Sequence, residues 1–302
     1  FTWEPTPPVR TGAEMRRVAI FAAGIGSVFI CSTLAQFGVS FIFSLFAPEL
    51  LKQMWFRLLA STFCLYLFGM LPGWLILRNI KPEPIESRRL GAVSVVALLS
   101  VSVAFLLLGS FAGNFVNTVI ESLTGKAQKN PVQNVADNTP LGVMALCTVI
   151  LAPVAEELFF RKVVIDRLRK YGDIPAILLS ATIFGLAHGN FSQFFYAFLL
   201  GLAFGAVYCM TGRLRYSIAL HVGLNFFGSV WSTLLIRRVG STFTIETLVG
   251  DPIALGMYLV DLAVYGFAVL TVIPSLVWLL KRFQEGYVYT RNPLFPHKVT
   301  RY

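Results

Sequence analysis

Charge is scarce in this sequence: Asp, Glu, Lys and Arg together make up 13% of the 302 residues, against about 25% in an average soluble domain. Hydrophobic residues make up 56%. Such a composition leaves too little polar surface to cover a soluble particle, so an ordinary soluble enzyme is excluded. The chain is predicted to fold within a bilayer.

Cysteine and histidine are also scarce, with four and three residues. The cysteines are far apart in apolar runs and form no CxxC pair. We therefore expect small core side chains, not disulfides or a thiol nucleophile, at Cys31, Cys64, Cys147 and Cys209. Basic arms with interleaved aromatic residues are missing as well, so no nucleic-acid partner is expected.

Long apolar runs are what the sequence has in abundance. A helix needs about 20 residues to cross the hydrocarbon core. Eight such segments are predicted, at 18–47, 58–77, 90–113, 141–158, 174–190, 192–211, 214–236 and 253–280. The fold class is therefore an all-α polytopic membrane protein of about eight transmembrane helices, with residues 1–302 forming a single transmembrane domain.

Lys and Arg are unevenly distributed between the loops. Most of the 25 lie in five segments that fall on one side of the membrane if the spans alternate: 10–17, 78–89, 161–170, 213–215 and 281–301. Because cytoplasmic loops carry the excess of positive charge, both termini are predicted to be cytoplasmic. The net charge of +10 is then explained by basic loops beside an anionic leaflet. The short loops look bacterial, and the expected location is the plasma membrane.

Few ionisable residues fall inside the predicted spans. A charge there costs at least a few kcal/mol, so such groups usually pair or face a cavity, and often mark function. They are Glu156, Glu157, His188, His221 and Asp261, with Arg161 at the margin of a span. Asp261 belongs to no motif, so we expect it to pair with a structural partner and not to take part in catalysis.

Helical spacing arranges these residues. Glu157 and Arg161 are four apart, acid before base, and can neutralise each other on one helix face. Glu156 points about 100° away from Glu157 and lacks that partner. His221 and Asn225 are also four apart and share a face of the seventh predicted span. The spacing therefore predicts one paired carboxylate and one free carboxylate.

Three short motifs resemble those of the CAAX protease and bacteriocin-processing family of intramembrane, glutamic-type endopeptidases. The sequence reads EELFFR at 156–161 for the EExxxR motif, FGLAH at 184–188 for FxxxH, and HVGLN at 221–225 for HxxxN. All three occur in the family order, within a core motif region at 141–235. The resemblance implies a conical cavity inside the membrane.

The resemblance also implies a role for each motif residue. Glu156 and His188 would activate a water molecule, and His221 and Asn225 would stabilise the oxyanion. Structural support would come from Glu157, Arg161 and Phe184. No cofactor is implied.

A zinc site remains an alternative, because one carboxylate and two histidines can also hold zinc. Its ligands would be Glu156, His188 and His221. The HExxH signature of common zinc proteases is absent, and no two histidines are four apart, so the site is predicted to contain no metal.

Three classes of function are compatible with these residues. The first is an endopeptidase acting on a peptide or membrane-protein substrate. The second is a scaffold, regulator or bacteriocin self-immunity factor of the same fold, and the third is a transporter with a buried proton relay. The complete set of motifs favours the endopeptidase. The sequence leaves the natural substrate open, including whether prenylated peptides are cleaved, and leaves the oligomeric state open too.

Overall fold

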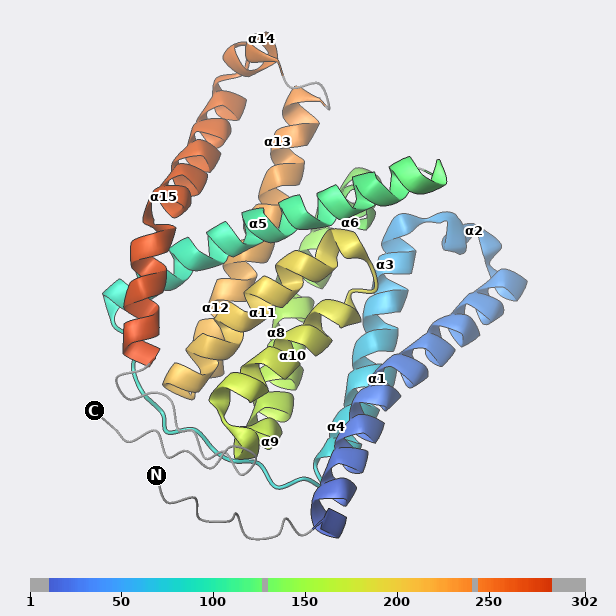
Figure 1. Ribbon diagram of the computed structural model, residues 1–302. Coiled ribbons are helices and arrows are strands. Elements are labelled where there is room, and N and C mark those ends of the chain that lie inside the picture. Colours follow the sequence, from blue (N-terminus) through green and yellow to red (C-terminus); the bar gives the residue numbers. More distant parts are fainter. Residues whose placement is uncertain (1–10, 127–129, 241–243, 284–302) are drawn as a thin grey trace.

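The computed structural model describes residues 11–126, 130–240 and 244–283, and all regular structure in these ranges is helical (Figure 1). Seven of the described helical segments are long and apolar enough to cross a membrane, and a shorter apolar helix covers Asp173–Ala187. The prediction of an all-α polytopic membrane protein is confirmed. Of the predicted basic segments 10–17 and 281–301, residue 10 and residues 284–301 lie outside the described residues.

The N-terminal part contains two spanning segments, a long third one and two short connecting helices. Its elements are α1 (Thr11–Phe46), α2 (Pro48–Lys52), α3 (Met54–Phe63), η1 (Cys64–Met70), α4 (Leu71–Leu77), α5 (Ala92–Thr124) and α6 (Pro131–Asn138). Here and below, η marks a π-helical or 3₁₀ stretch, and α3, η1 and α4 form one continuous helix.

The C-terminal part contains the motif-bearing segments. Its elements are α7 (Leu141–Met144), η2 (Ala145–Leu151), α8 (Ala152–Glu156), η3 (Glu157–Ile165), α9 (Asp166–Leu168), η4 (Arg169–Tyr171), α10 (Asp173–Ala187), α11 (Phe191–Thr211), α12 (Leu214–Asn225), η5 (Phe226–Trp231), α13 (Ser232–Val239), α14 (Ile245–Val249) and α15 (Pro252–Arg282). The stretch from α7 to η4 is one continuous span, as is the stretch from α12 to α13.

Several predicted boundaries are wrong. The first span begins at Thr11 instead of residue 18, and the third continues past residue 113 to Thr124. The fourth span does not end at residue 158 but continues to Tyr171, because Phe159, Val164 and Ile165 are buried among neighbouring helices. The fifth is only 15 residues long, Asp173–Ala187. The longer fourth span places Glu157 14 residues before Tyr171, about 21 Å along the helix, and His188 lies at a similar depth after Asp173.

The basic segments that the sequence assigns to one side of the membrane meet at one end of the bundle. Arg17 donates to the carbonyl of Arg167, at 2.8 Å, and so ties α1 to the end of the fourth span. The extended stretch before α5 is held there too, since the Arg88 amide donates to the Thr211 carbonyl at 2.8 Å. The sidedness of this end relative to the cytoplasm remains a prediction.

The core is built around α10 and α11, an antiparallel pair against which η3 and α5 pack (Figure 1). Helix α5 crosses α11 closely because Gly109 has no side chain. A Cβ at Gly109 would lie 2.3 Å from Cα of Tyr196, nearer than real Cβ atoms come to a backbone atom. The four cysteines are free thiols, and three of them are buried, as expected for small core residues.

Replacing Gly109 with Ala is expected to push α5 away from α11 and to lower the melting temperature of the purified protein. Overpacking of this kind costs typically about 1–3 kcal/mol. Gly266→Ala is the matched control, because nothing lies within 4 Å of a Cβ built there. Equal melting temperatures of the two variants, measured by thermal unfolding in detergent, would contradict the close approach.

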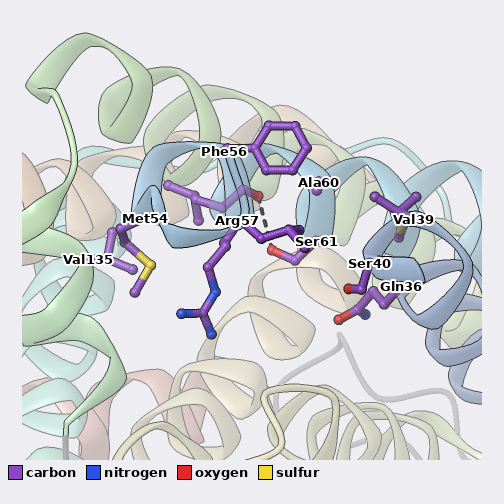
Figure 2. A pocket seen from close by; sticks show the side chains of 12 residues that line it. Gln36, Val39, Ser40, Met54, Phe56, Arg57, Ala60, Ser61 and Val135 are labelled. Atoms are coloured by element: carbon purple, nitrogen blue, oxygen red, sulfur yellow. Dashed lines mark hydrogen bonds between the residues drawn. The ribbon is translucent and has the colours of Figure 1, made fainter. Parts of the chain in front are cut away.

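A hollow of about 310 Å³ lies between α1 and α3, with α2 and α6 at its edge (Figure 2). Gln36, Ser40 and Ser61 contribute polar groups to its wall, and Arg57 extends into it. None of the motif residues lines this hollow. The motif residues converge elsewhere in the bundle, next to the part of this helix that contains Tyr66.

Candidate active site

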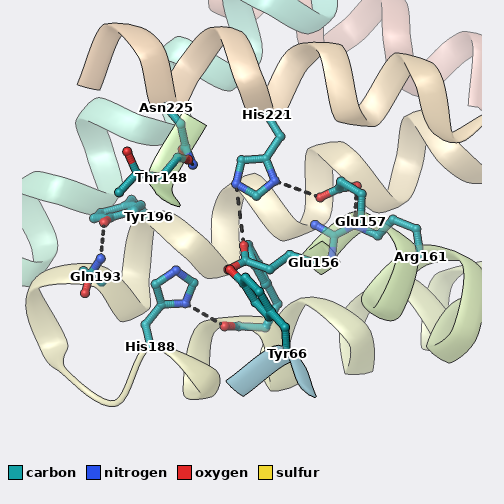
Figure 3. A network of polar contacts seen from close by, with 11 residues as sticks. Tyr66, Thr148, Glu156, Glu157, Arg161, His188, Gln193, Tyr196, His221 and Asn225 are labelled. Atoms are coloured by element: carbon teal, nitrogen blue, oxygen red, sulfur yellow. Dashed lines mark hydrogen bonds and ion pairs between the residues drawn. The ribbon is translucent and has the colours of Figure 1, made fainter. Parts of the chain in front are cut away.

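Several residues of the network stand in or beside π-helical turns. Of the motif residues, Glu156 comes directly before η3 and Asn225 directly before η5, and outside the motifs Tyr66 lies in η1 and Thr148 in η2. A π-helical turn holds one residue more than an α-helical turn, so it rotates the side chains that follow it, and such turns are frequent at functional sites. These turns direct side chains from four separate helical stretches toward one network (Figure 3).

The local sequence explains two of these turns. Pro72 follows η1 and Pro153 follows η2, each as the second residue of the next α-helical segment. Proline has no N–H to donate, and its ring collides with the preceding turn. The helix accommodates both effects by widening the turn before the proline.

Glu157 and Arg161 form the predicted pair, with Oε2 of Glu157 3.1 Å from Nε of Arg161 and both side chains fully buried. The guanidinium lies over two aromatic rings, 4.8 Å from the centre of Phe184 and 5.5 Å from that of Phe204. Ring faces attract a desolvated cation. Phe184, the first residue of the second motif, therefore supports the buried charge.

His221 lies between the two glutamates. Its Nδ1 is 3.1 Å from Oε1 of Glu157, and its Nε2 is 3.8 Å from Oε2 of Glu156. A neutral imidazole has one N–H and one lone pair, so an N–H directed at Glu157 leaves a lone pair directed at Glu156. An imidazole that donates from Nε2 as well must carry a hydrogen on both ring nitrogens.

Glu156 has a second neighbour that the sequence did not reveal. The hydroxyl of Tyr66 donates to Oε1 of Glu156 at 3.2 Å. The two carboxylate oxygens therefore face different helices, one toward Tyr66 and the other toward His221 (Figure 3). No ion pair joins Glu156 to an arginine among the described residues, and the side chains that contact its carboxylate are Tyr66 and His221.

His188 directly follows α10 as its C-cap, and it makes no hydrogen bond to Glu156 among those of the described residues. Its Nδ1 lies 2.9 Å from the carbonyl oxygen of Phe184. A carbonyl can only accept, so Nδ1 carries the hydrogen, and Nε2 of the neutral ring keeps a lone pair. That lone pair is available to a water molecule.

Asn225 is fixed by a contact to another helix. Its Nδ2 donates to the carbonyl of Thr148 at 2.7 Å, which leaves one more N–H on the same nitrogen. Thr148 lies in η2, where backbone bonding is already irregular. The structure thus brings together residues from all three motifs and adds Tyr66, which lies 90 residues before Glu156 in an apolar run and has no motif of its own.

Metal-ligating side chains are not clustered in the part of the chain that the structure describes: no group of three or more His, Cys, Asp or Glu residues there could hold a metal ion. Glu156 and His221 face each other, but His188 is turned toward the Phe184 carbonyl. The zinc alternative is therefore a question for experiment. Asp261 lies apart from the network and accepts a hydrogen bond from Nε1 of Trp231 at 2.8 Å.

The fold and the network define a class, a polytopic membrane protein with carboxylate and histidine groups buried among its spans. Comparison with known proteins adds the family. Residues 138–227, which include all three motifs, match the family model described as type II CAAX prenyl endopeptidase Rce1-like. These residues confirm the resemblance to the CAAX protease family.

A curated relative points the same way. The chain is 26% identical over 156 residues to a protein of Bacillus subtilis (strain 168) named "Putative membrane peptidase YdiL". The match covers 51% of this chain and 63% of the relative's length. No solved structure matches the chain. Both matches support a membrane peptidase.

Proposed function

We propose that the protein is an intramembrane endopeptidase that hydrolyses a peptide bond in a peptide or membrane-protein substrate. The observation that carries the proposal is the Glu156 carboxylate, which is held by Tyr66 and His221 inside a membrane bundle. A carboxylate in such a place is costly and is typical of a functional site. The match of the motif-bearing residues to a peptidase family supports the same reaction class.

In this mechanism Glu156 and His188 activate the attacking water. The water oxygen bonds to the carbonyl carbon of the substrate, and its proton passes to Glu156. His221 and Asn225 donate hydrogen bonds to the oxygen that becomes negative. When the carbon–nitrogen bond breaks, Glu156 returns the proton to the leaving amine. Arg161, paired with Glu157, holds the position of His221 through that carboxylate.

The proposed setting is the plasma membrane, with the basic end of the bundle toward the cytoplasm. In the same proposal the protein needs no cofactor. Zinc bound by Glu156, His188 and His221 is the alternative, and would polarise the substrate carbonyl in place of the water-activating pair. A zinc chelator distinguishes the two mechanisms, because it would stop a zinc-dependent reaction and leave the glutamate reaction unchanged.

The test is cleavage of a fluorogenic peptide library by the purified protein in lipid, with and without a zinc chelator. We expect cleavage that survives the chelator and falls by about 10²-fold or more in His188→Gln, which loses the ring lone pair. Loss of cleavage on chelation would replace the glutamate mechanism by a zinc mechanism. Products identified by mass spectrometry would give the specificity.

A further inference from the structure

The turn between α10 and α11 contains an interlocked set of side-chain amides. The backbone N–H of Gln193 donates to Oδ1 of Asn190 at 3.0 Å, which identifies the other end of the Asn190 amide as the donor. That nitrogen, Nδ2, donates at 2.7 Å both to the His188 carbonyl and to Oε1 of Gln193. Each amide is thereby oriented by its neighbour.

The last amide of this set orients a phenol. Because Oε1 of Gln193 already accepts from Asn190, its Nε2 faces Tyr196 and donates to the hydroxyl oxygen at 2.9 Å. The Tyr196 oxygen is therefore an acceptor in this bond, and its own hydrogen finds no acceptor among the described residues. Tyr66 differs, since its hydrogen is engaged by Glu156.

Tyr196 is close to the proposed reaction centre. The centre of its ring is 6.4 Å from that of His188, and the two ring planes meet at 71°. Figure 3 shows Gln193 on the far side of Tyr196 from His221. Gly109 allows α5 to press against the Tyr196 backbone, which fixes the position of the residue.

The donors assigned to the oxyanion are partly engaged elsewhere. Both ring nitrogens of His221 face glutamates, and Asn225 has one of its two N–H groups on the Thr148 carbonyl. We propose that Tyr196 is a further catalytic residue, whose hydroxyl donates a hydrogen bond to the substrate oxygen as it becomes negative. The proposal rests on the endopeptidase function and adds to it a donor that lies outside all three motifs.

Tyr196→Phe is the first test, on a peptide that the wild type cleaves. Loss of one oxyanion donor lowers kcat by about 10²–10³-fold, and KM should change little because the bond forms in the transition state. Tyr265→Phe removes a hydroxyl from α15 that, among the described residues, has no hydrogen bond to the network, and it should leave kcat unchanged. An unchanged kcat in Tyr196→Phe would overturn the proposal while leaving the endopeptidase function intact.

Gln193 allows a test in which the phenol stays in place. In Gln193→Glu the new carboxylate has no hydrogen to give, so it accepts the Tyr196 hydrogen and removes it from the substrate. We expect kcat to fall nearly as far as in Tyr196→Phe. Gln193→Leu supplies neither donor nor acceptor and should lower kcat less.

A phosphinate peptide, which resembles the tetrahedral intermediate, gives a readout that a structural role would not change. Tyr196→Phe should weaken inhibition by the phosphinate by the same factor as it lowers kcat/KM. Binding of an uncleaved substrate analogue, a peptide whose scissile amide is N-methylated, should stay the same. Equal weakening for both ligands would assign Tyr196 to substrate binding or packing and overturn the proposal. A wild type that cleaves no peptide would instead overturn the endopeptidase function itself.

Discussion

Glu156→Gln is expected to abolish peptide cleavage, with a fall in kcat of about 10³-fold or more, within the range for loss of a general base. The amide is the same size as the carboxylate, and its oxygen can still accept from Tyr66, so the fold should be kept. It cannot take a proton from water. The measurement is kcat on a cleaved peptide, with thermal unfolding to show that the variant is folded.

Glu121→Gln is the matched control, because it makes the same chemical change at an exposed position near the end of α5. Its kcat should equal that of the wild type. A Glu156→Gln variant that keeps more than a tenth of the wild-type rate would show that another group activates the water.

Arg161→Met is expected to destabilise the folded protein by about 3–5 kcal/mol, the usual effect of leaving one buried charge without its partner. Glu157 would remain as a fully buried carboxylate. The double variant Glu157→Gln, Arg161→Met removes both charges and should recover much of the melting temperature, since pairs replaced together are often neutral. It should still be inactive, because His221 loses the carboxylate that orients it.

Lys52→Met is the control for charge removal at the surface. Lys52 pairs with Glu49 at 2.6 Å, but both side chains are largely exposed, at 69% and 78%. Such pairs contribute about 0–1 kcal/mol, so the melting temperature should hardly change. If Arg161→Met were as stable as Lys52→Met, the buried ion pair would not be holding the site together.

The sequence predicts those features that depend on neighbours along one helix. Apolar runs predict the spans, and a spacing of four predicts that Glu157 and Arg161 pair. Contacts between helices are not encoded in such periodicity, and so Tyr66 and Tyr196 were missed. Both lie in apolar runs where a tyrosine is as ordinary as a phenylalanine.

The π-helical turns also limited the prediction. A helix projected at 3.6 residues per turn places each residue on a definite face, but an extra residue in a turn shifts every later one by about 100°. A projection at 3.6 residues per turn would therefore misplace the side chains that follow η1 and η3. Pro72 and Pro153 were the only local signals of the widened turns before them.

The shortness of helix α10 bears on how water reaches the buried site. Its 15 residues extend about 22 Å, less than the roughly 30 Å of a hydrocarbon core. The turn that follows, with His188 and Asn190, thus stops short of the opposite surface. Non-helical backbone at such a depth is tolerated where it is covered by protein or wetted. In the proposed hydrolysis, which consumes one water for each bond broken, a wetted turn at this depth would supply that water within the lipid barrier.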